Sequence, residues 1–281
     1  MRELRFVITP FCNYKCFFCH SESITNKIAL YLNPSDYEFM AKVAQGQLGW
    51  NTCTLTGGEP LISPIFKETC EKLKNLGIAI TVVTNASLLA RPAEVLKDIA
   101  QINISVHTML PDVYEQITQV NYPLENVLST IVTTRMKLPE LAIHLNYTVI
   151  KRLNDSNAEF EEFIKFANKI KAKAKFIDLS TTDESLRTDA LGIVRQLEGL
   201  GFEIKDKNFW QYHLMRKTEE VTVVKCPFNN KYEDLPARDV FVEPNGILYR
   251  SFGGYLAVDA LNEIKSRNTV GLLQKINILL K

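Results

Sequence analysis

The sequence lacks any uninterrupted run of eighteen apolar residues, so it predicts no membrane-spanning helix. The first residues, Met1-Arg2-Glu3-Leu4-Arg5, lack the apolar core of a secretory signal peptide, and we therefore expect a cytoplasmic protein. An excess of charge is also missing, because 33 Lys and Arg against 32 Asp and Glu leave a net charge of +1. This balance gives no global field that would favour a nucleic acid polymer or an anionic membrane as a partner.

Internal repeats and low-complexity linkers are absent as well. Hydrophobic residues make up 46% and charged residues 23% of the 281 positions, as in an ordinary globular protein. This length suffices for one large domain, or for a main domain with a small appendage.

Short apolar runs alternate with helix-like segments over the first 180 residues or so. The predicted strands are Leu4–Ile8, Thr52–Thr56, Ile78–Thr84, Ile102–Val106, Ile143–Ile150 and Lys175–Leu179. The predicted helices cover about 34–46, 64–76, 92–100, 112–137 and 156–171. Such alternation is typical of parallel βαβ units, and six units predict an α/β fold with a partial, TIM-like (β/α)6 barrel.

After about residue 200 the pattern changes to short strands. Pro244-Asn245-Gly246 predicts a hairpin turn, and residues 269–280 predict a terminal amphipathic helix. We therefore expect residues 1–200 to form the barrel and residues 201–281 to form a small β-containing cap that holds the substrate region.

Six cysteines are present, and three of them lie within eight residues. Cys12, Cys16 and Cys19 have the spacing C-x3-C-x2-C, directly after the first predicted strand. Closely spaced cysteines in a reducing compartment are more often metal ligands than disulfide partners. Three thiolates would leave one iron of a [4Fe–4S] cluster without a protein ligand and open to a cofactor or substrate.

Two plainer alternatives exist for these cysteines. They can be unrelated thiols, or His20 can complete a Cys3His zinc site, although its position next to Cys19 is awkward for a shared metal. Cys53 and Cys70 fall in a predicted strand and helix, and we expect them in the core.

A second motif, Gly57-Gly58-Glu59-Pro60, follows the second predicted strand about forty residues after the cysteines. The glycines would let a ligand approach the backbone, Glu59 offers acceptors for an ammonium group, and Pro60 stiffens the exit. By itself the motif could be an ordinary turn.

Together the two motifs resemble the radical S-adenosylmethionine (SAM) superfamily. This resemblance implies that Cys12, Cys16 and Cys19 bind three irons, that SAM chelates the fourth, and that Gly57, Gly58, Glu59 and Pro60 receive the methionine amine. Phe18 would pack near the adenine. The reduced cluster would cleave SAM to methionine and a 5′-deoxyadenosyl radical, which abstracts hydrogen from the substrate.

Further segments resemble the GTP 3′,8-cyclase branch of the superfamily. The resemblance implies SAM contacts for Thr84, Asn85, Ser105, Asn146 and Arg152. Each position also has a structural alternative. Thr84 and Ser105 can satisfy strand-end backbone groups, Asn146 can be a hydrogen-bonded core residue, and Arg152 can be a solvated surface charge. His107 is expected in the core, with a substrate contact as the alternative.

The sequence departs from the cyclase in its C-terminal part, where only Cys226 remains of the three cysteines that hold a second cluster there. One thiolate cannot anchor an auxiliary cluster. Cys226 is then either a buried apolar residue or a hydrogen-atom donor to a substrate radical. Residues 208–232, which include Arg216 as a candidate phosphate ligand, are expected to be a lid or a solvated connector.

The sequence thus predicts a radical SAM enzyme, of lyase or oxidoreductase type, that cyclises or rearranges a small, nucleotide-like molecule. Its expected cofactors are a [4Fe–4S] cluster and SAM, and its expected partners are this substrate and an electron donor such as flavodoxin or ferredoxin. The alternatives are a peptide-modifying radical SAM enzyme and a non-catalytic metal-binding protein.

Overall fold

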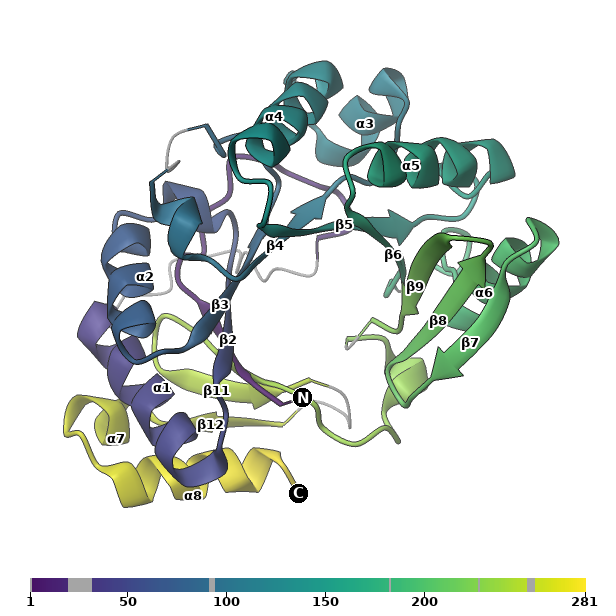
Figure 1. Ribbon diagram of the computed structural model, residues 1–281. Coiled ribbons are helices and arrows are strands. Elements are labelled where there is room, and N and C mark those ends of the chain that lie inside the picture. Colours follow the sequence, from purple (N-terminus) through teal and green to yellow (C-terminus); the bar gives the residue numbers. More distant parts are fainter. Residues whose placement is uncertain (1, 20–31, 91–93, 182, 227, 252–255) are drawn as a thin grey trace.

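The fold, seen in a computed structural model, is a single curved sheet with helices on its outer side (Figure 1). The structure describes residues 2–19, 32–90, 94–181, 183–226, 228–251 and 256–281. The strands are β1 (Leu4–Val7), β2 (Thr52–Thr56), β3 (Ala79–Thr84), β4 (Gln101–Ser105), β5 (Ala142–Val149), β6 (Lys173–Asp178), β7 (Glu203–Lys207), β8 (Gln211–Arg216), β9 (Glu219–Val224), β10 (Val240–Val242), β11 (Ile247–Arg250) and β12 (Ala257–Asp259).

The α-helices are α1 (Pro34–Leu48), α2 (Phe66–Asn75), α3 (Pro111–Thr118), α4 (Leu124–Lys137), α5 (Asn157–Lys169), α6 (Ala190–Gly199), α7 (Leu261–Lys265) and α8 (Thr269–Leu279). Short 3₁₀ turns are η1 (Pro60–Ile62), η2 (Val95–Asp98) and η3 (Asn230–Tyr232). Every helix among the described residues is too short or too polar to span a lipid bilayer.

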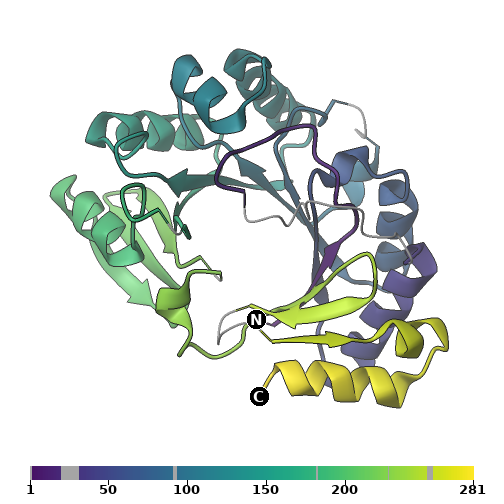
Figure 2. The ribbon, with the colours of Figure 1, turned by 180° about the vertical axis from the view of Figure 1, so that it is seen from behind.

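The strand order is β12-β11-β10-β1-β2-β3-β4-β5-β6-β9-β8-β7. Strands β1 to β6 are parallel to their neighbours, and β10 and β9 extend this parallel arrangement at its two sides. The remaining strands are antiparallel additions at both edges. The structure therefore confirms the predicted partial, TIM-like barrel, and the strands after residue 200 join both edges of the same sheet (Figure 2).

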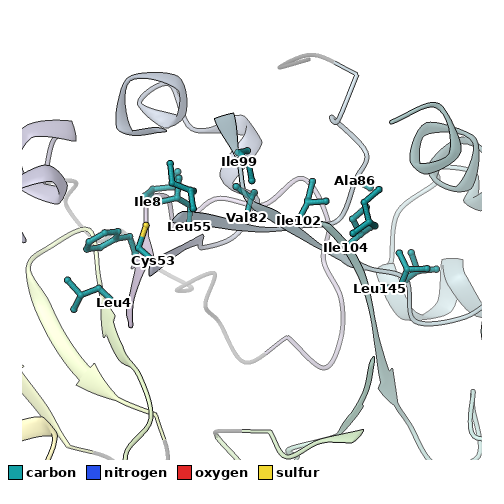
Figure 3. Close-up of a cluster of buried hydrophobic side chains, with 14 of the residues drawn as sticks. Leu4, Ile8, Cys53, Leu55, Val82, Ala86, Ile99, Ile102, Ile104 and Leu145 are labelled. Carbon is teal, nitrogen blue, oxygen red and sulfur yellow. The ribbon is translucent and has the colours of Figure 1, made fainter. Parts of the chain in front are cut away.

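Alternation of side chains along the strands separates the core from the interior of the barrel. In β4, Ile102 and Ile104 are fully buried, whereas Gln101, Asn103 and Ser105 line a cavity. The apolar set of β1 to β5 packs beneath the helices, as Figure 3 shows for several of these side chains. The barrel interior is therefore hollow and lined by polar as well as apolar side chains, unlike the aliphatic layers of a closed TIM barrel.

Three sequence predictions of local structure were wrong. The helix expected over 112–137 is two helices, α3 and α4, because Pro123 cannot continue a helix and starts the second one. Residues 92–100 contain only η2 among the described positions. Residues 208–232 contain the paired strands β8 and β9, so this segment contributes an antiparallel hairpin to the sheet.

The C-terminal helices are tied to α1 through Asp36, whose side chain is 1% exposed. Asp36 completes a capping box with Asn33, and it accepts hydrogen bonds from Lys265 (2.6 Å) and Arg267 (2.8 Å). Burial alone would raise the pKa of Asp36, but the bonds from Lys265, the Asn33 backbone and Arg267 outweigh it and lower the pKa below its usual 3.8.

We predict that Asp36→Asn lowers the free energy of unfolding by about 2 kcal/mol, because a helix cap and two charged partners are lost while those partners can return to water. The control is Asp112→Asn, an exposed aspartate in the first turn of α3. Urea titrations measure both variants. Since the pKa of Asp36 is lowered on folding, its contribution is complete above pH 3.8 and declines as the pH falls further. Equal losses for both variants at pH 7 would refute this assignment.

Candidate active site

A cavity of about 530 Å³ occupies the interior of the barrel and is lined by the polar faces of the strands. The cysteines and strand-end loops form one part of its wall. The other part is formed nearer the strand starts by Thr52, Thr54, Thr81 and Gln101. Of the predicted site residues, the lining includes Cys12, Cys16, Phe18, Cys19, Gly57, Gly58, Thr84, Asn85, Ser105, Asn146 and Cys226.

The three cysteines lie on one loop that leaves β1 and faces this cavity. Cys12 and Cys16 are half-buried and Cys19 is exposed. The loop is fixed on α3, because the backbone N–H groups of Lys15 and Phe17 donate to the carbonyl oxygens of Thr118 (3.0 Å) and Ile117 (3.2 Å). The sequence spacing thus brings the three sulfur atoms to one wall of the cavity.

The surroundings of Cys12 and Cys16 disfavour ionisation of their thiols to thiolates. Burial raises the pKa of Cys16 to about 12, and the neighbouring Cys19 and Cys12 act in the same direction. Burial also raises the pKa of Cys12, with Glu59 and Cys19 adding to it. Three thiolates can therefore coexist here only with a compensating positive charge, which a metal centre supplies.

Among the residues that the structure describes, no three His, Cys, Asp or Glu side chains surround a point suited to a single metal ion. Three thiolates that each bind a different iron of a cluster do not need to share such a point. His20, the fourth ligand in the zinc alternative, lies outside the described residues.

Gly57 and Gly58 allow the loop after β2 to lie directly against the cysteine loop. A Cβ atom on Gly58 would come 2.1 Å from the Phe11 carbonyl oxygen, and one on Gly57 would come 2.3 Å from that of Thr9. Gly57 also has φ +140°, a conformation that L side chains rarely adopt. The N–H groups of Gly58 and Glu59 donate to Thr9 (2.9 Å) and Phe11 (2.8 Å) carbonyls. These glycines hold two backbones together, a role that the sequence analysis did not foresee.

Glu59 is fully buried and joins the exits of β2 and β3. Its carboxylate accepts hydrogen bonds from the Thr84 hydroxyl (2.7 Å), the Asn85 backbone (2.8 Å) and the Leu61 backbone (3.1 Å). Burial raises the pKa of Glu59 to about 7, although these three donors oppose the shift. The carboxylate therefore organises the loop that carries Thr84 and Asn85.

His107, which follows β4, and Phe18, on the cysteine loop, also line the cavity. Their rings meet edge to face at 5.0 Å. His107 Nδ1 accepts the backbone N–H of Thr148 (3.1 Å), so the ring proton lies on Nε2. Burial lowers the pKa of His107 to about 4, which keeps the ring neutral.

Of the remaining predicted residues, Cys226 lines the cavity, whereas Arg152 and Arg216 do not. Cys226 lines the cavity, and its backbone N–H donates to Asp178, which also accepts the Tyr232 hydroxyl (2.6 Å). Arg152 is exposed and does not line the described cavity. Arg216 is bound to Glu161, Glu219 and the Leu200 carbonyl, so it is a structural residue and the phosphate role considered for it is wrong.

Sequence reasoning missed a charged group in the same cavity, formed by Glu3, Arg5, Lys175, Arg238 and Asp239. Burial lowers the pKa of Lys175 to about 8, and the charges of Arg238 and Arg5 lower it further. The sequence did contain a signal for these positions. Side chains alternate between the two faces of a strand, and Arg5 and Lys175 each stand between buried neighbours in β1 and β6, which places them on the face toward the barrel interior.

Comparison of the sequence with models of known protein families identifies the family of this chain. The profile of the radical SAM superfamily matches residues 6–167. The chain belongs to the radical SAM superfamily. This match confirms the family predicted from the sequence and, with it, the expected cofactors, a [4Fe–4S] cluster and SAM.

Curated relatives extend the comparison. A probable GTP 3′,8-cyclase of Thermococcus kodakarensis is 34% identical over 188 residues, which are 66% of this chain and 59% of the relative. One of Methanocaldococcus jannaschii is 31% identical over 216 residues, 74% of this chain and 67% of the relative. The chain thus spans about three fifths of the length of the Thermococcus protein.

Solved structures share the fold. Streptococcus suis SuiB bound to S-adenosylmethionine has a TM-score of 0.69 at 15% identity, over 92% of this chain and 63% of that one. Native anSMEcpe with bound AdoMet has a TM-score of 0.61 at 13% identity, over 100% and 84% of the two chains. These likenesses support the radical SAM barrel.

We predict that Gly58→Ala displaces the cysteine loop, because its methyl group would overlap the Phe11 backbone. After anaerobic reconstitution, iron bound per chain should fall at least severalfold. Gly46→Ala is the matched control, since no atom lies within 4 Å of a Cβ at this position in α1. That variant should bind iron normally and be stabilised by up to ~1 kcal/mol. Normal iron content in Gly58→Ala would contradict the proposed packing.

Proposed function

We propose that Cys12, Cys16 and Cys19 hold the [4Fe–4S] cluster and that the enzyme abstracts hydrogen from a small anionic, nucleotide-like substrate. When bound, the reduced cluster supplies the electron that cleaves SAM to methionine and a 5′-deoxyadenosyl radical. The observation that carries the proposal is the convergence of these three thiols on one wall of a polar cavity.

The SAM-binding region is proposed to follow the loop exits around that wall. Gly57 and Gly58 offer backbone groups, while Thr84, Ser105 and Asn146 present polar side chains to the cavity. Phe18 offers a ring face for the adenine. Glu59 and Pro60 support this region from behind, and Arg152 would have to move its exposed side chain to reach a ligand.

The substrate region is proposed to include the basic side chains of Arg5, Lys175 and Arg238. Burial lowers the pKa of Lys175, and the charges of Arg238 and Arg5 lower it further. These three cations and the two carboxylates of Glu3 and Asp239 leave the group with one net positive charge, which an anion would offset. A phosphate or carboxylate group suits such a set of donors. The likeness to probable GTP 3′,8-cyclases supports a nucleotide, although the second cysteine cluster expected for that reaction is lacking in this sequence.

Cys226 is proposed as a hydrogen-atom donor to a substrate radical, since it lies on the cavity wall. The transfer leaves a thiyl radical on Cys226, which would return to the thiol by taking one electron from an external reductant and one proton from solvent. We propose a flavodoxin or a ferredoxin as this reductant. Peptide modification is the second candidate, because SuiB has also been solved bound to the precursor peptide SuiA and has the same fold.

We predict that anaerobically reconstituted protein binds about four irons and, on reduction with dithionite, converts SAM to 5′-deoxyadenosine. Single Cys12→Ala, Cys16→Ala and Cys19→Ala variants should lose this conversion by more than a hundredfold, because each removes one iron ligand. Cys53→Ala and Cys70→Ala are controls, since both residues are buried in the core. Colourless protein that contains zinc would refute the proposal and favour a non-catalytic metal-binding protein.

We predict that Lys175→Gln weakens binding of GTP, used as a probe, by about tenfold, because one charged hydrogen bond is worth about 1.5 kcal/mol. Lys173→Gln is the matched control, as Lys173 is exposed and lies two residues earlier in β6. Equilibrium dialysis under anaerobic conditions measures both. Equal affinities for the two variants would remove Lys175 from the substrate region, and the SuiA peptide serves as the alternative probe.

A further inference from the structure

Asn13, Asn85 and Ser87 form a closed cycle of side-chain hydrogen bonds beside Cys12. Asn13 Nδ2 donates to Ser87 Oγ (2.8 Å), Ser87 Oγ donates to Asn85 Oδ1 (2.7 Å), and Asn85 Nδ2 donates to Asn13 Oδ1 (2.9 Å). The cycle joins the cysteine loop to the exit of β3, although these segments are separated by more than seventy residues.

The cycle determines which way the Asn85 amide faces. Its Oδ1 also accepts the backbone N–H of Ser87 (3.0 Å), and a backbone N–H can only donate. The oxygen of Asn85 is therefore fixed on the Ser87 side, and Nδ2 must face the cysteine loop. One of its two hydrogens is used by Asn13, and the other is left for Cys12, whose Sγ lies 3.9 Å from Nδ2.

Asn85 also connects this sulfur to Glu59, because the Asn85 backbone N–H donates to Glu59 Oε2 (2.8 Å). Asn85 is half-buried. The Glu59 carboxylate holds its backbone, and the cycle with Asn13 and Ser87 holds its side chain. Cys12 Sγ receives a second donor, the backbone N–H of Tyr14 (3.3 Å).

We infer that the side chain of Asn85 is a positioning residue that hydrogen-bonds the Cys12 thiolate and raises the reduction potential of the cluster. Hydrogen bonds to cluster sulfurs stabilise the more negative, reduced state, so their loss makes reduction harder. Asn13 and Ser87 act through Asn85 by holding its amide in the donating orientation. The inference rests on the proposed ligation of the cluster by Cys12.

The test is an EPR-monitored redox titration of the reconstituted enzyme without SAM, with iron content measured on each sample. Asn85→Ala is expected to lower the equilibrium constant for one-electron reduction about tenfold, which corresponds to a shift of about 59 mV to lower potential. Asn85→Asp should lower it further, because a negative charge replaces the donor. Asn13→Ala should give a smaller shift, since the Ser87 backbone still orients Asn85.

Asn126→Ala, an exposed position on α4, is the control and should leave the potential unchanged. A native potential in Asn85→Ala with a full complement of iron overturns the inference while leaving the proposed function intact. If Asn85→Ala does not retain its cluster, a potential of Asn85→Asp at or above the native value overturns it. Failure of the native protein to assemble a cluster refutes the proposed function instead.

Discussion

The site depends on the contact between two backbones at the exits of β1 and β2. At Gly58 there is no room for even a methyl group, because the Phe11 carbonyl occupies the place where a Cβ atom would lie. Two N–H groups of the β2 exit then donate to the cysteine loop. This close approach holds the loop that carries Cys12 above the barrel, and the same segment continues into Glu59.

From Glu59 the arrangement extends to the third strand. Its buried carboxylate accepts hydrogen bonds from Thr84 and Asn85, and the side chain of Asn85 donates a hydrogen bond to Cys12. A small hydrogen-bond network thus connects strand-end loops that are far apart in the chain. An ordered network of this kind pre-organises a cofactor site, because the loops need little rearrangement when the cofactor binds.

Much of this could be predicted from the sequence because its signals are local. Cys12, Cys16 and Cys19 lie within eight residues of one another, and Gly57-Gly58-Glu59-Pro60 is a continuous segment. The barrel was predicted from the alternation of short apolar runs with helix-like segments, which can also be read along the chain. The break at Pro123 was also a local signal, but the amphipathic pattern on both sides of it concealed the division into α3 and α4.

Features that depend on the register between strands could not be predicted. Arg5 and Arg238 are far apart in the chain and meet because β1 pairs with β10, with Leu4 opposite Val240. Strand β8 was missed because only Leu214 in it is buried, which leaves no clear alternation in Gln211–Arg216. The cycle of Asn13, Asn85 and Ser87 involves ordinary polar residues whose type carries no signal until the loops are placed together.

The protein supplies only three side-chain ligands to the proposed cluster, so one iron is left open. Mössbauer spectroscopy of ⁵⁷Fe-reconstituted protein, recorded with and without SAM, distinguishes this iron from the other three. SAM should change the parameters of one iron in four, since it binds only to the open position. If none of the four irons responds to SAM, or if the protein holds no iron, the cluster has no open position and this ligation is wrong.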